Sequence, residues 1–244
     1  MELYGRVALV TGAARRVGRA IALALAGRGA DVVIHYKSSA DEANEVVQAV
    51  ERLGRRASTI QADLAESDQV EMLADCAVKA FGKIDVLVNS AAIFRRTPLD
   101  RLTVGEWEQF LRVNVTGPFF LTRRLGLLMR QQGSGKIINI ADVAGIRPWA
   151  DFLPYSISKG MVIAMTQGLA KALAPEVQVN AVAPGTVLPA EGYDEQERAS
   201  IIRRTPLKRI GDPADIAQTV LFLVEGSDFI TGQVVVVDGG RSIL

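Results

Sequence analysis

The stretch VALVTGAARRVG, residues 7–18, decides the fold. Its first four residues are apolar, which is typical of a parallel strand covered on both faces. Gly12 and Gly18 follow, and an alanine-rich helical segment runs on to Gly29. Strand, glycine turn and helix form the unit whose helix N-terminus binds phosphate through free N–H groups. The same glycines also suit ordinary turn geometry and close helix–strand packing, so this stretch alone leaves phosphate binding open.

Strand-like and helix-like segments alternate along the rest of the chain. This predicts an α/β fold, a single-domain Rossmann-type doubly wound parallel sheet of about seven strands with helices on both faces. Gly117-Pro118, inside a long helical segment, predicts a kink. We expect residues 1–244 to form one domain, with the charged segment 188–206 as a small substrate lid. The further expected strands are 31–36, 57–61, 84–88, 136–140, 177–182 and 234–237, and the further expected helices are 41–53, 68–81, 104–130, 155–174 and one from 213.

The composition narrows the possible partners. The chain has 28 Lys and Arg against 27 Asp and Glu, so bulk attraction to nucleic acid or to a membrane surface is not expected. Cys76 and His35 are the only residues of their types, which excludes an intrachain disulfide and a His/Cys metal cluster. No apolar run approaches the ~20 residues of a membrane helix and no signal segment is evident. We therefore expect a cytoplasmic protein without a metal.

Candidate acid–base chemistry lies between Asp142 and Lys159. Tyr155 and Lys159 are four positions apart at the start of a helical run, so both side chains project from one face. A fixed ammonium near a phenol favours the phenolate, which predicts a Tyr155 pKa shifted from ~10 towards neutrality. Asp142 follows an apolar strand, and its carboxyl is expected beside the same phenol. A Tyr-x-x-x-Lys spacing also arises by chance on helix surfaces.

The end of the second expected strand indicates the cofactor. An enzyme that prefers NAD tends to place an acid there to hold the ribose 2′-hydroxyl. This chain has His35-Tyr36-Lys37-Ser38-Ser39 instead, with Arg15 and Arg16 in the facing turn. A 2′-phosphate would meet cations and hydroxyls, so the sequence favours NADPH.

Three more residues follow strand ends, at the edge of the sheet where ligands bind. Asp63 is suited to accept from the adenine amino group or to begin a helix, and the sequence does not decide between the two. Asn89 follows the fourth strand. Phe94 lies in the loop after it and is suited either to stack a flat substrate or to cover the core.

The motifs together resemble the short-chain dehydrogenase/reductase family along nearly the whole chain. The matching motifs are Thr11-Gly12 to Gly18, Asp63, Asn89, Asn114, Tyr155, Lys159, Pro184-Gly185 and Asp238-Gly239-Gly240. Arg16 stands where the family usually has glycine, Ser90-Ala91-Ala92 departs from its Asn-Ala-Gly turn, and Asp142 replaces its catalytic serine. These departures resemble the pteridine reductase branch, in which Ala92 often is serine and Ser38 often is arginine.

The resemblance implies roles for individual residues. A pterin would lie between Phe94 and the nicotinamide, and NADPH would deliver hydride to a C=N carbon. Asp142 and Tyr155 would supply the proton, Lys159 would bind the ribose and lower the phenol pKa, and Asn114 would hold a relay water. Tyr193, in the expected lid, is a further substrate contact. The expected cofactor-binding residues are Gly12, Arg15, Arg16, Val17, Gly18, His35, Tyr36, Lys37, Ser38, Asp63, Leu64, Asn89, Ser90, Ala91, Tyr155, Lys159, Pro184, Gly185, Thr186 and Val187.

Three functions remain open on the sequence. The first is an NADPH-dependent pteridine reductase acting on dihydrobiopterin, dihydromonapterin or dihydrofolate-like substrates. The second is a carbonyl reductase such as a 3-oxoacyl-thioester reductase. The third is a non-catalytic NADPH-binding regulator, which would have no need of Asp142, Tyr155 and Lys159. Members of the family usually form tetramers, so a homotetramer is expected.

Overall fold

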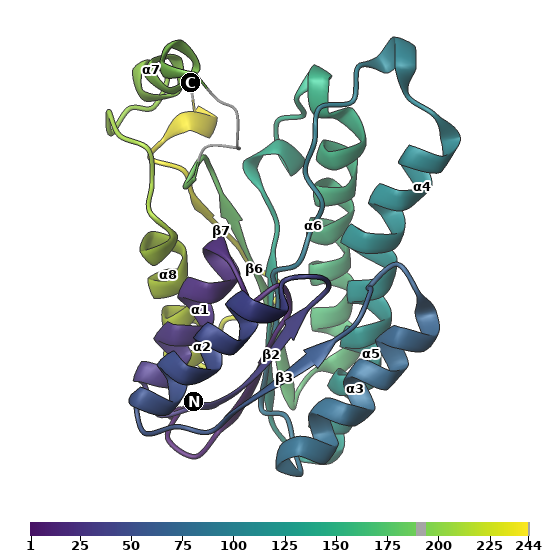
Figure 1. Ribbon diagram of the computed structural model, residues 1–244, viewed down its shortest axis with the longest axis vertical. Coiled ribbons are helices and arrows are strands. Elements are labelled where there is room, and N and C mark those ends of the chain that lie inside the picture. The colour runs from purple at the N-terminus through teal and green to yellow at the C-terminus, as the bar shows by residue number, and fades with distance from the viewer. Residues whose placement is uncertain (189–193, 244) are drawn as a thin grey trace.

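Seven parallel strands lie side by side in the order β3-β2-β1-β4-β5-β6-β7 in the computed structural model of the chain, which describes residues 1–188 and 194–243 (Figure 1). The order reverses between β1 and β4, and open sheets of this kind bind ligands beside such a switch, at the carboxyl ends of the strands. The predicted fold is confirmed. The strands are β1 (Val7–Val10), β2 (Asp31–Tyr36), β3 (Ala57–Gln61), β4 (Val86–Asn89), β5 (Gly135–Ile140), β6 (Val177–Pro184) and β7 (Val234–Val237).

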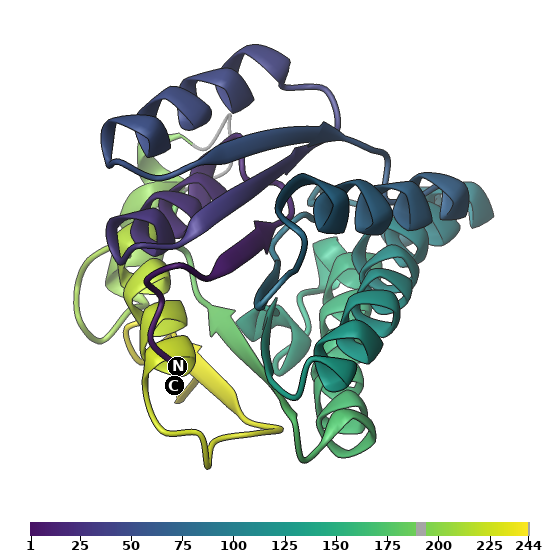
Figure 2. The same cartoon turned by 90° about the horizontal axis from the view of Figure 1, so that it is seen from below.

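Helices cover both faces of the sheet, as Figure 2 shows. One face carries α1 (Arg16–Gly27), α2 (Ala40–Arg52) and α8 (Pro213–Glu225), and the other carries α3 (Ser67–Phe81), α4 (Val104–Leu111), α5 (Gly117–Gln131) and α6 (Leu153–Leu173). α7 (Glu195–Arg203) lies beyond the strand ends, beside the C-terminus (Figure 1). The lid predicted at 188–206 includes residues outside the described part of the chain, so its function as a lid stays a prediction.

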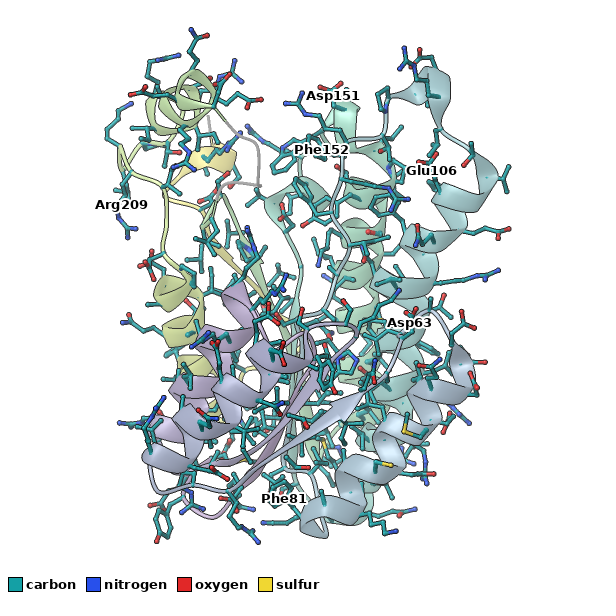
Figure 3. The ribbon with its side chains drawn as sticks, viewed as in Figure 1. Asp63, Phe81, Glu106, Asp151, Phe152 and Arg209 are labelled. Carbon is teal, nitrogen blue, oxygen red and sulfur yellow. The ribbon has the colours of Figure 1, made fainter. Side chains whose placement is uncertain are left out.

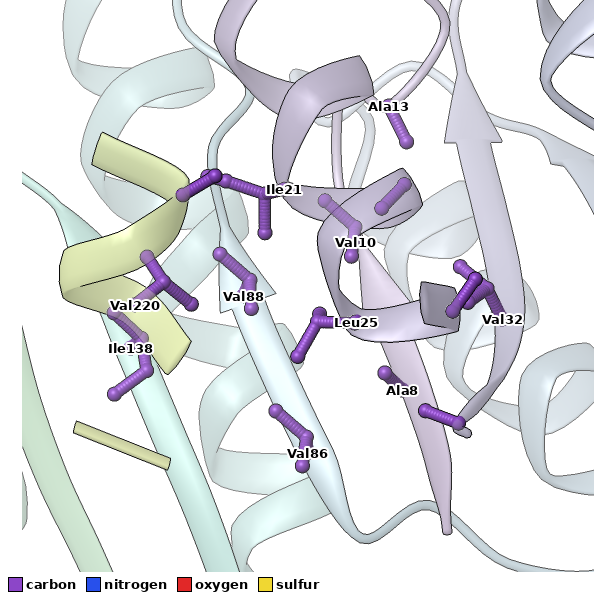
Figure 4. Close-up of a cluster of buried hydrophobic side chains, with 14 of the residues drawn as sticks. Ala8, Val10, Ala13, Ile21, Leu25, Val32, Val86, Val88, Ile138 and Val220 are labelled. Atoms are coloured by element: carbon purple, nitrogen blue, oxygen red, sulfur yellow. The ribbon is translucent and has the colours of Figure 1, made fainter. Parts of the chain in front are cut away.

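The two faces of β1 explain its unbroken apolar run. Ala8 and Val10 pack with Ile21 and Leu25 of α1 in one cluster (Figure 4), whereas Val7 and Leu9 belong to the cluster on the opposite face. All four β1 residues are buried. A strand buried on both faces cannot alternate polar and apolar residues, and this is the pattern that the sequence has.

The segment predicted as one kinked helix changes its hydrogen-bond pattern between α4 and α5 and stays helical throughout. A π-helical turn, Arg112–Thr116, joins them, and the N–H of Gly117 donates to the carbonyl of Arg112. Pro118 has no N–H to continue the ladder, which accounts for a change of hydrogen-bond pattern at this point, and the predicted kink stays a prediction. A Cβ on Gly117 would lie 2.2 Å from the Leu64 carbonyl oxygen, so glycine allows the close approach of this turn to the loop after β3.

Candidate active site

A cleft of about 750 Å³ opens at the carboxyl ends of the strands. Figure 3 labels two of the residues that line it, Phe152 in the upper part of the view and Asp63 lower down. The cleft brings together most of the residues predicted from the sequence: Gly12, Arg15, Arg16, Val17, Gly18, His35, Lys37, Asp63, Leu64, Ser90, Ala91, Phe94, Asp142, Tyr155, Lys159, Pro184, Gly185, Thr186 and Val187. Of the other predicted residues, Tyr36, Ser38, Asn89 and Asn114 do not line it, and Tyr193 lies outside the described residues.

The glycine turn leads into α1 without a side-chain cap. The side chain of Arg15, the N-cap residue, makes no capping hydrogen bond, so the first N–H groups of the helix stay available to an anion. Gly12 has φ +65°, and a Cβ on Gly18 would lie 2.2 Å from the Gly12 carbonyl oxygen. This cradle, closed to any side chain, fits the phosphates of a dinucleotide.

Arg16 has φ +52°, in the left-handed region that favours glycine. This backbone conformation explains why glycine is usual at this position in the family that the sequence resembles. Arginine there costs about 1–3 kcal/mol of backbone strain. Its Nη2 donates to the carbonyl of Leu188 at 3.0 Å, which ties the turn to the segment after β6.

His35, at the end of β2, holds the glycine turn through a hydrogen bond to its backbone. Its Nδ1 accepts from the N–H of Gly12 at 3.1 Å, and its Nε2 lies 3.0 Å from the carbonyl oxygen of Ala62. These two contacts require the neutral tautomer with the proton on Nε2, because Nδ1 is an acceptor. Burial lowers the pKa of His35 from 6.5 to about 4. His35 therefore lines the cleft as a positioning residue, and nothing in the sequence distinguished that role from direct cofactor contact.

The His35 interaction predicts a pH-dependent loss of stability. A histidine with a lowered folded-state pKa contributes stability that is present above pH 6.5 and is lost as pH falls towards about 4. We expect the free energy of unfolding of the wild type to fall by about 3 kcal/mol more than that of His35→Asn between pH 7 and pH 4. Urea unfolding at several pH values measures this difference. Equal pH dependence of the two proteins would contradict the assignment.

Two of the three cations predicted to meet a 2′-phosphate, Arg15 and Lys37, are paired with carboxylates. Lys37 Nζ lies 2.6 Å from Asp63 Oδ2, and Arg15 forms an ion pair with Glu42. Burial opposes ionisation of Asp63, yet the Lys37 hydrogen bond and the N–H of Ala65 lower the pKa of this carboxyl. A bound 2′-phosphate would compete with Asp63 and Glu42 for these side chains.

Two predicted asparagines have structural contacts. Asn89 Nδ2 donates to Thr122 of α5 and to Asn139 of β5, both at 2.8 Å, so the side chain points towards the core between this strand pair and α5 and not into the cleft. Asn114 accepts from the N–H of Ile93 and donates to the Ile93 carbonyl and to Ser158. Asn114 thus holds the loop that carries Phe94, and its role with a relay water stays a prediction.

Asp142, Tyr155 and Lys159 meet on the floor of the cleft. The Tyr155 hydroxyl donates to Asp142 Oδ2 at 2.7 Å, and the N–H of Ala144 donates to Asp142 Oδ1 at 2.7 Å. Lys159 Nζ donates to the carbonyl of Ile140 at 2.6 Å and lies 5.7 Å from the Tyr155 ring centroid. The predicted contact between a carboxyl at the end of β5 and the phenol is confirmed.

The prediction of a lowered phenol pKa is wrong. Burial and the Asp142 carboxylate raise the pKa of Tyr155 well above 10. Lys159 is not among the groups that shift this pKa, and its ammonium donates to the Ile140 carbonyl instead of to the phenol oxygen. Burial also raises the pKa of Asp142 and lowers that of Lys159 to about 8. Tyr155 is therefore a protonated donor at neutral pH, and its neighbour is a carboxyl that can itself take up a proton.

Phe94 combines the two roles that the sequence left open. Its ring stacks on Phe152 with centroids 4.6 Å apart and meets the Tyr155 ring edge-on at 4.7 Å. It remains 40% exposed and lines the cleft. Phe94 therefore covers the aromatic cluster and also offers a ring surface to a ligand.

Three arginines that are not among the predicted site residues line the cleft, and we call the part that they line the outer cleft. Arg96, Arg204 and Arg241 all line it, and Arg241 is 5.6 Å from the Trp149 ring centroid. No spacing motif connects these positions, because they come from three separate parts of the chain. The Asp238-Gly239-Gly240 motif gave the only signal, since Arg241 directly follows it.

Comparison with known proteins now identifies the family. The sequence model described as enoyl-(acyl carrier protein) reductase, of the short-chain dehydrogenase type, matches residues 12–242. This chain is a short-chain dehydrogenase/reductase. It is 42% identical to a 3-oxoacyl-[acyl-carrier-protein] reductase of Synechocystis sp., over 98% of this chain and 97% of that protein. It is 35% identical to 3beta-hydroxysteroid dehydrogenase 1 of Eggerthella lenta, over 99% of this chain and 95% of that protein.

A solved relative supports the same family assignment. A short-chain dehydrogenase of Burkholderia cenocepacia, in complex with NADP, is 37% identical, covers 99% of each chain and has a TM-score of 0.90. The short-chain dehydrogenase/reductase family and its oxidoreductase activity are thus confirmed, and the prediction of a non-catalytic regulator is not supported. The Synechocystis and Eggerthella relatives are named for 3-oxoacyl and hydroxysteroid substrates rather than for pterins, so assignment to the pteridine reductase branch is not confirmed.

Neither a membrane-spanning helix nor a metal-binding cluster is found in residues 1–188 and 194–243. No helix in these ranges is long and apolar enough to cross a membrane. No group of three His, Cys, Asp or Glu side chains there is arranged to hold a metal ion.

Proposed function

We propose that this protein is an NADPH-dependent reductase of keto groups, of the 3-oxoacyl-thioester class. The observation that carries the proposal is the hydrogen-bonded pair of Tyr155 and Asp142 on the cleft floor, 2.7 Å apart. In this structure the phenolic proton is donated to Asp142. A substrate oxygen that replaces Asp142 as the acceptor would meet Tyr155 as one donor and Asp142, when protonated, as a second. The named activities of the relatives, a 3-oxoacyl thioester reductase and a hydroxysteroid dehydrogenase, support a carbonyl substrate.

NADPH is the cofactor in this proposal. The uncapped start of α1 would hold its pyrophosphate, and Arg15, Arg16 and Lys37 lie along the same end of the cleft. Pro184, Gly185 and Lys159 also line the cleft, and we propose that they hold the nicotinamide half. Bound NADPH supplies hydride to the carbonyl carbon.

In this proposal the protein's own side chains supply the proton to the substrate oxygen. A substrate oxygen placed against Tyr155 receives the phenolic proton as negative charge develops on it. Asp142 in its protonated form donates a hydrogen bond to the same oxygen, which is the task of the serine usual at this position. Burial raises the pKa of Asp142 and so favours this form. The Lys159 ammonium adds a positive charge beneath the site.

A pteridine substrate is the second candidate, and two observations favour it. Asp142 supplies an acid where the family usually has serine, and reduction of C=N places charge on a nitrogen that a carboxyl can protonate. Phe94 offers a partly exposed ring over which a pterin could stack. Dihydrobiopterin and dihydromonapterin are therefore the comparison substrates.

Deuterium transfer tests the proposed reaction. Incubation of acetoacetyl thioester with NADPH deuterated at nicotinamide C4 is expected to give a 3-hydroxybutyryl thioester with deuterium on C3, observed by mass spectrometry. Unlabelled or unreduced thioester, with label transferred to a pterin instead, would favour the second candidate.

Assembly and location are part of the proposal. Phe119 and Phe120 on α5 and Met161 on α6 are apolar side chains at least 37% exposed, and a second copy of the chain would cover them in a homotetramer. A cytoplasmic location fits the NADPH requirement. Closure of segment 188–206 over substrate is proposed with them.

A further inference from the structure

Three arginines gather at the end of the cleft away from the glycine turn. Arg96 lies in the loop after β4, Arg204 directly follows α7, and Arg241 lies in the C-terminal turn. Two of them contact neighbouring aromatic rings. Arg96 lies 5.9 Å from the Phe152 ring centroid, Arg241 lies over the Trp149 ring, and these two rings contact each other. Three separate chain segments thus contribute arginines to the lining of one cleft, and the aromatic pair Trp149–Phe152 connects two of them.

Arg241 is held in position by its surroundings. The Asp238 carboxylate accepts from the N–H groups of Gly240 and Ser242, at 2.8 and 2.6 Å, and so fixes the turn that carries the arginine. Its Nη1 donates to Thr186 Oγ1 at 2.9 Å. A guanidinium has five N–H donors, so most of those on Arg241 remain for a ligand.

The carboxylates nearby do not neutralise this end of the cleft. Glu197 is paired with Arg96 at 2.8 Å. Asp151 lines the cleft and is exposed to solvent. Among described residues, Arg204 has no side-chain hydrogen bond or ion pair. Arg241 forms no ion pair with the described residues: its contacts are a hydroxyl and an indole ring, and its charge acts on the Asp142 carboxyl only through space, where it lowers the pKa. An anion entering here would gain two guanidinium partners and displace none.

We infer that the outer cleft binds an anionic oxygen group of the substrate, with Arg241 as its principal partner and Arg204 as the second. Two sources offer this chemistry, a carboxylate on the substrate itself and the phosphates of a coenzyme A carrier. The inference rests on the proposed keto reduction only for its choice of probes.

Three probes carry the same reacting group and differ in their anion. Acetoacetate carries a carboxylate, acetoacetyl-coenzyme A carries phosphates, and acetoacetyl-N-acetylcysteamine is neutral. We expect kcat/KM with one of the anionic probes to exceed that with the neutral probe at least ~10-fold, the effect of about 1.4 kcal/mol of binding. The preferred anion identifies the source.

Substitution at position 241 tests the assignment. Arg241→Gln is expected to reduce the anionic-to-neutral ratio towards one, mainly through KM, and Arg241→Lys is expected to restore part of it, because a charge without the planar fork remains. Arg204→Gln should lower the ratio less. Arg101→Gln, an exposed arginine outside the cleft, is the control. Equal kcat/KM for all three probes in the wild type, or an unchanged ratio in Arg241→Gln, would overturn the inference.

A binding measurement separates this inference from the proposed reaction. The chain has two tryptophans, so Trp107→Phe leaves Trp149, under the Arg241 guanidinium, as the only indole fluorophore. Titration of the NADP-loaded protein with the three probes should change Trp149 emission at lower concentrations of the preferred anion than of the neutral probe. This result without turnover would refute the reaction and support the anion site. Identical titrations would refute the anion site, whatever the turnover.

Discussion

Tyr155→Phe is expected to lose at least ~10²-fold in kcat, the contribution typical of a general acid. The variant removes the phenolic hydroxyl and its proton, and it keeps the ring that packs against Phe94. Because the phenol pKa is raised, the hydroxyl of the wild type is protonated at neutral pH, so its loss removes a donor in the ground state and in the transition state. Steady-state turnover with acetoacetyl thioester and NADPH measures the effect.

Cofactor binding is the control for Tyr155→Phe. The dissociation constant of NADPH, from nicotinamide fluorescence, should stay within ~3-fold of the wild-type value, since Lys159 and the glycine turn are untouched. Wild-type turnover in this variant would refute the role of Tyr155. A joint loss of turnover and NADPH binding would instead indicate a damaged fold.

Asp142→Ala is expected to lose ~10²-fold or more in kcat, the effect of removing one donor to a developing oxyanion. Asp142→Ser should recover to within ~10-fold of the wild type with acetoacetyl thioester, because a hydroxyl can again donate to the carbonyl oxygen. For a pterin, the carboxyl itself supplies the proton, so Asp142→Ser should remain as impaired as Asp142→Ala. The two substitutions therefore discriminate between carbonyl and C=N chemistry.

The N-cap role of Asp142 must be separated from its role in the reaction when these two variants are compared. Asp142 caps the short helix Val143–Gly145 through the N–H of Ala144, and serine is a good N-cap whereas alanine is not. Unfolding should show a loss of about 1 kcal/mol for Asp142→Ala and less for Asp142→Ser. If Asp142→Ser is folded and as inactive as Asp142→Ala on the thioester, the proposed hydrogen-bonding role of Asp142 is wrong.

Much of the fold could be predicted from the sequence because local signals agreed with it. The apolar run at Val7 predicted a strand buried on both faces, and Pro118 predicted an irregularity in the long helical segment, where the structure has a π-helical turn between α4 and α5. The ends of strands were predicted less accurately. The fourth strand was expected from Ile84, but β4 begins at Val86, and the side chain of Asp85 before it forms ion pairs with Arg6 and Lys83.

The site depended on three-dimensional distances that spacing does not contain. A Tyr-x-x-x-Lys pattern places two side chains on one helix face, yet the atom nearest to the phenol oxygen is the Asp142 carboxylate, which reverses the expected pKa shift. Asn89 was predicted at the right strand end, but its side chain bonds Thr122 and Asn139 in the core and does not line the cleft. Arg241 reaches the cleft only because β7 pairs with β6, which brings the C-terminal turn beside Thr186.

The most direct test of the proposed function is a comparison of kcat/KM for acetoacetyl thioester with that for dihydrobiopterin and dihydromonapterin, with NADPH as the reductant. We expect the thioester to be reduced with kcat/KM at least ~10-fold above either pterin, a difference of about 1.4 kcal/mol in transition-state stabilisation. Turnover of the pterins alone would contradict the carbonyl reductase and establish Asp142 as the acid for a ring nitrogen.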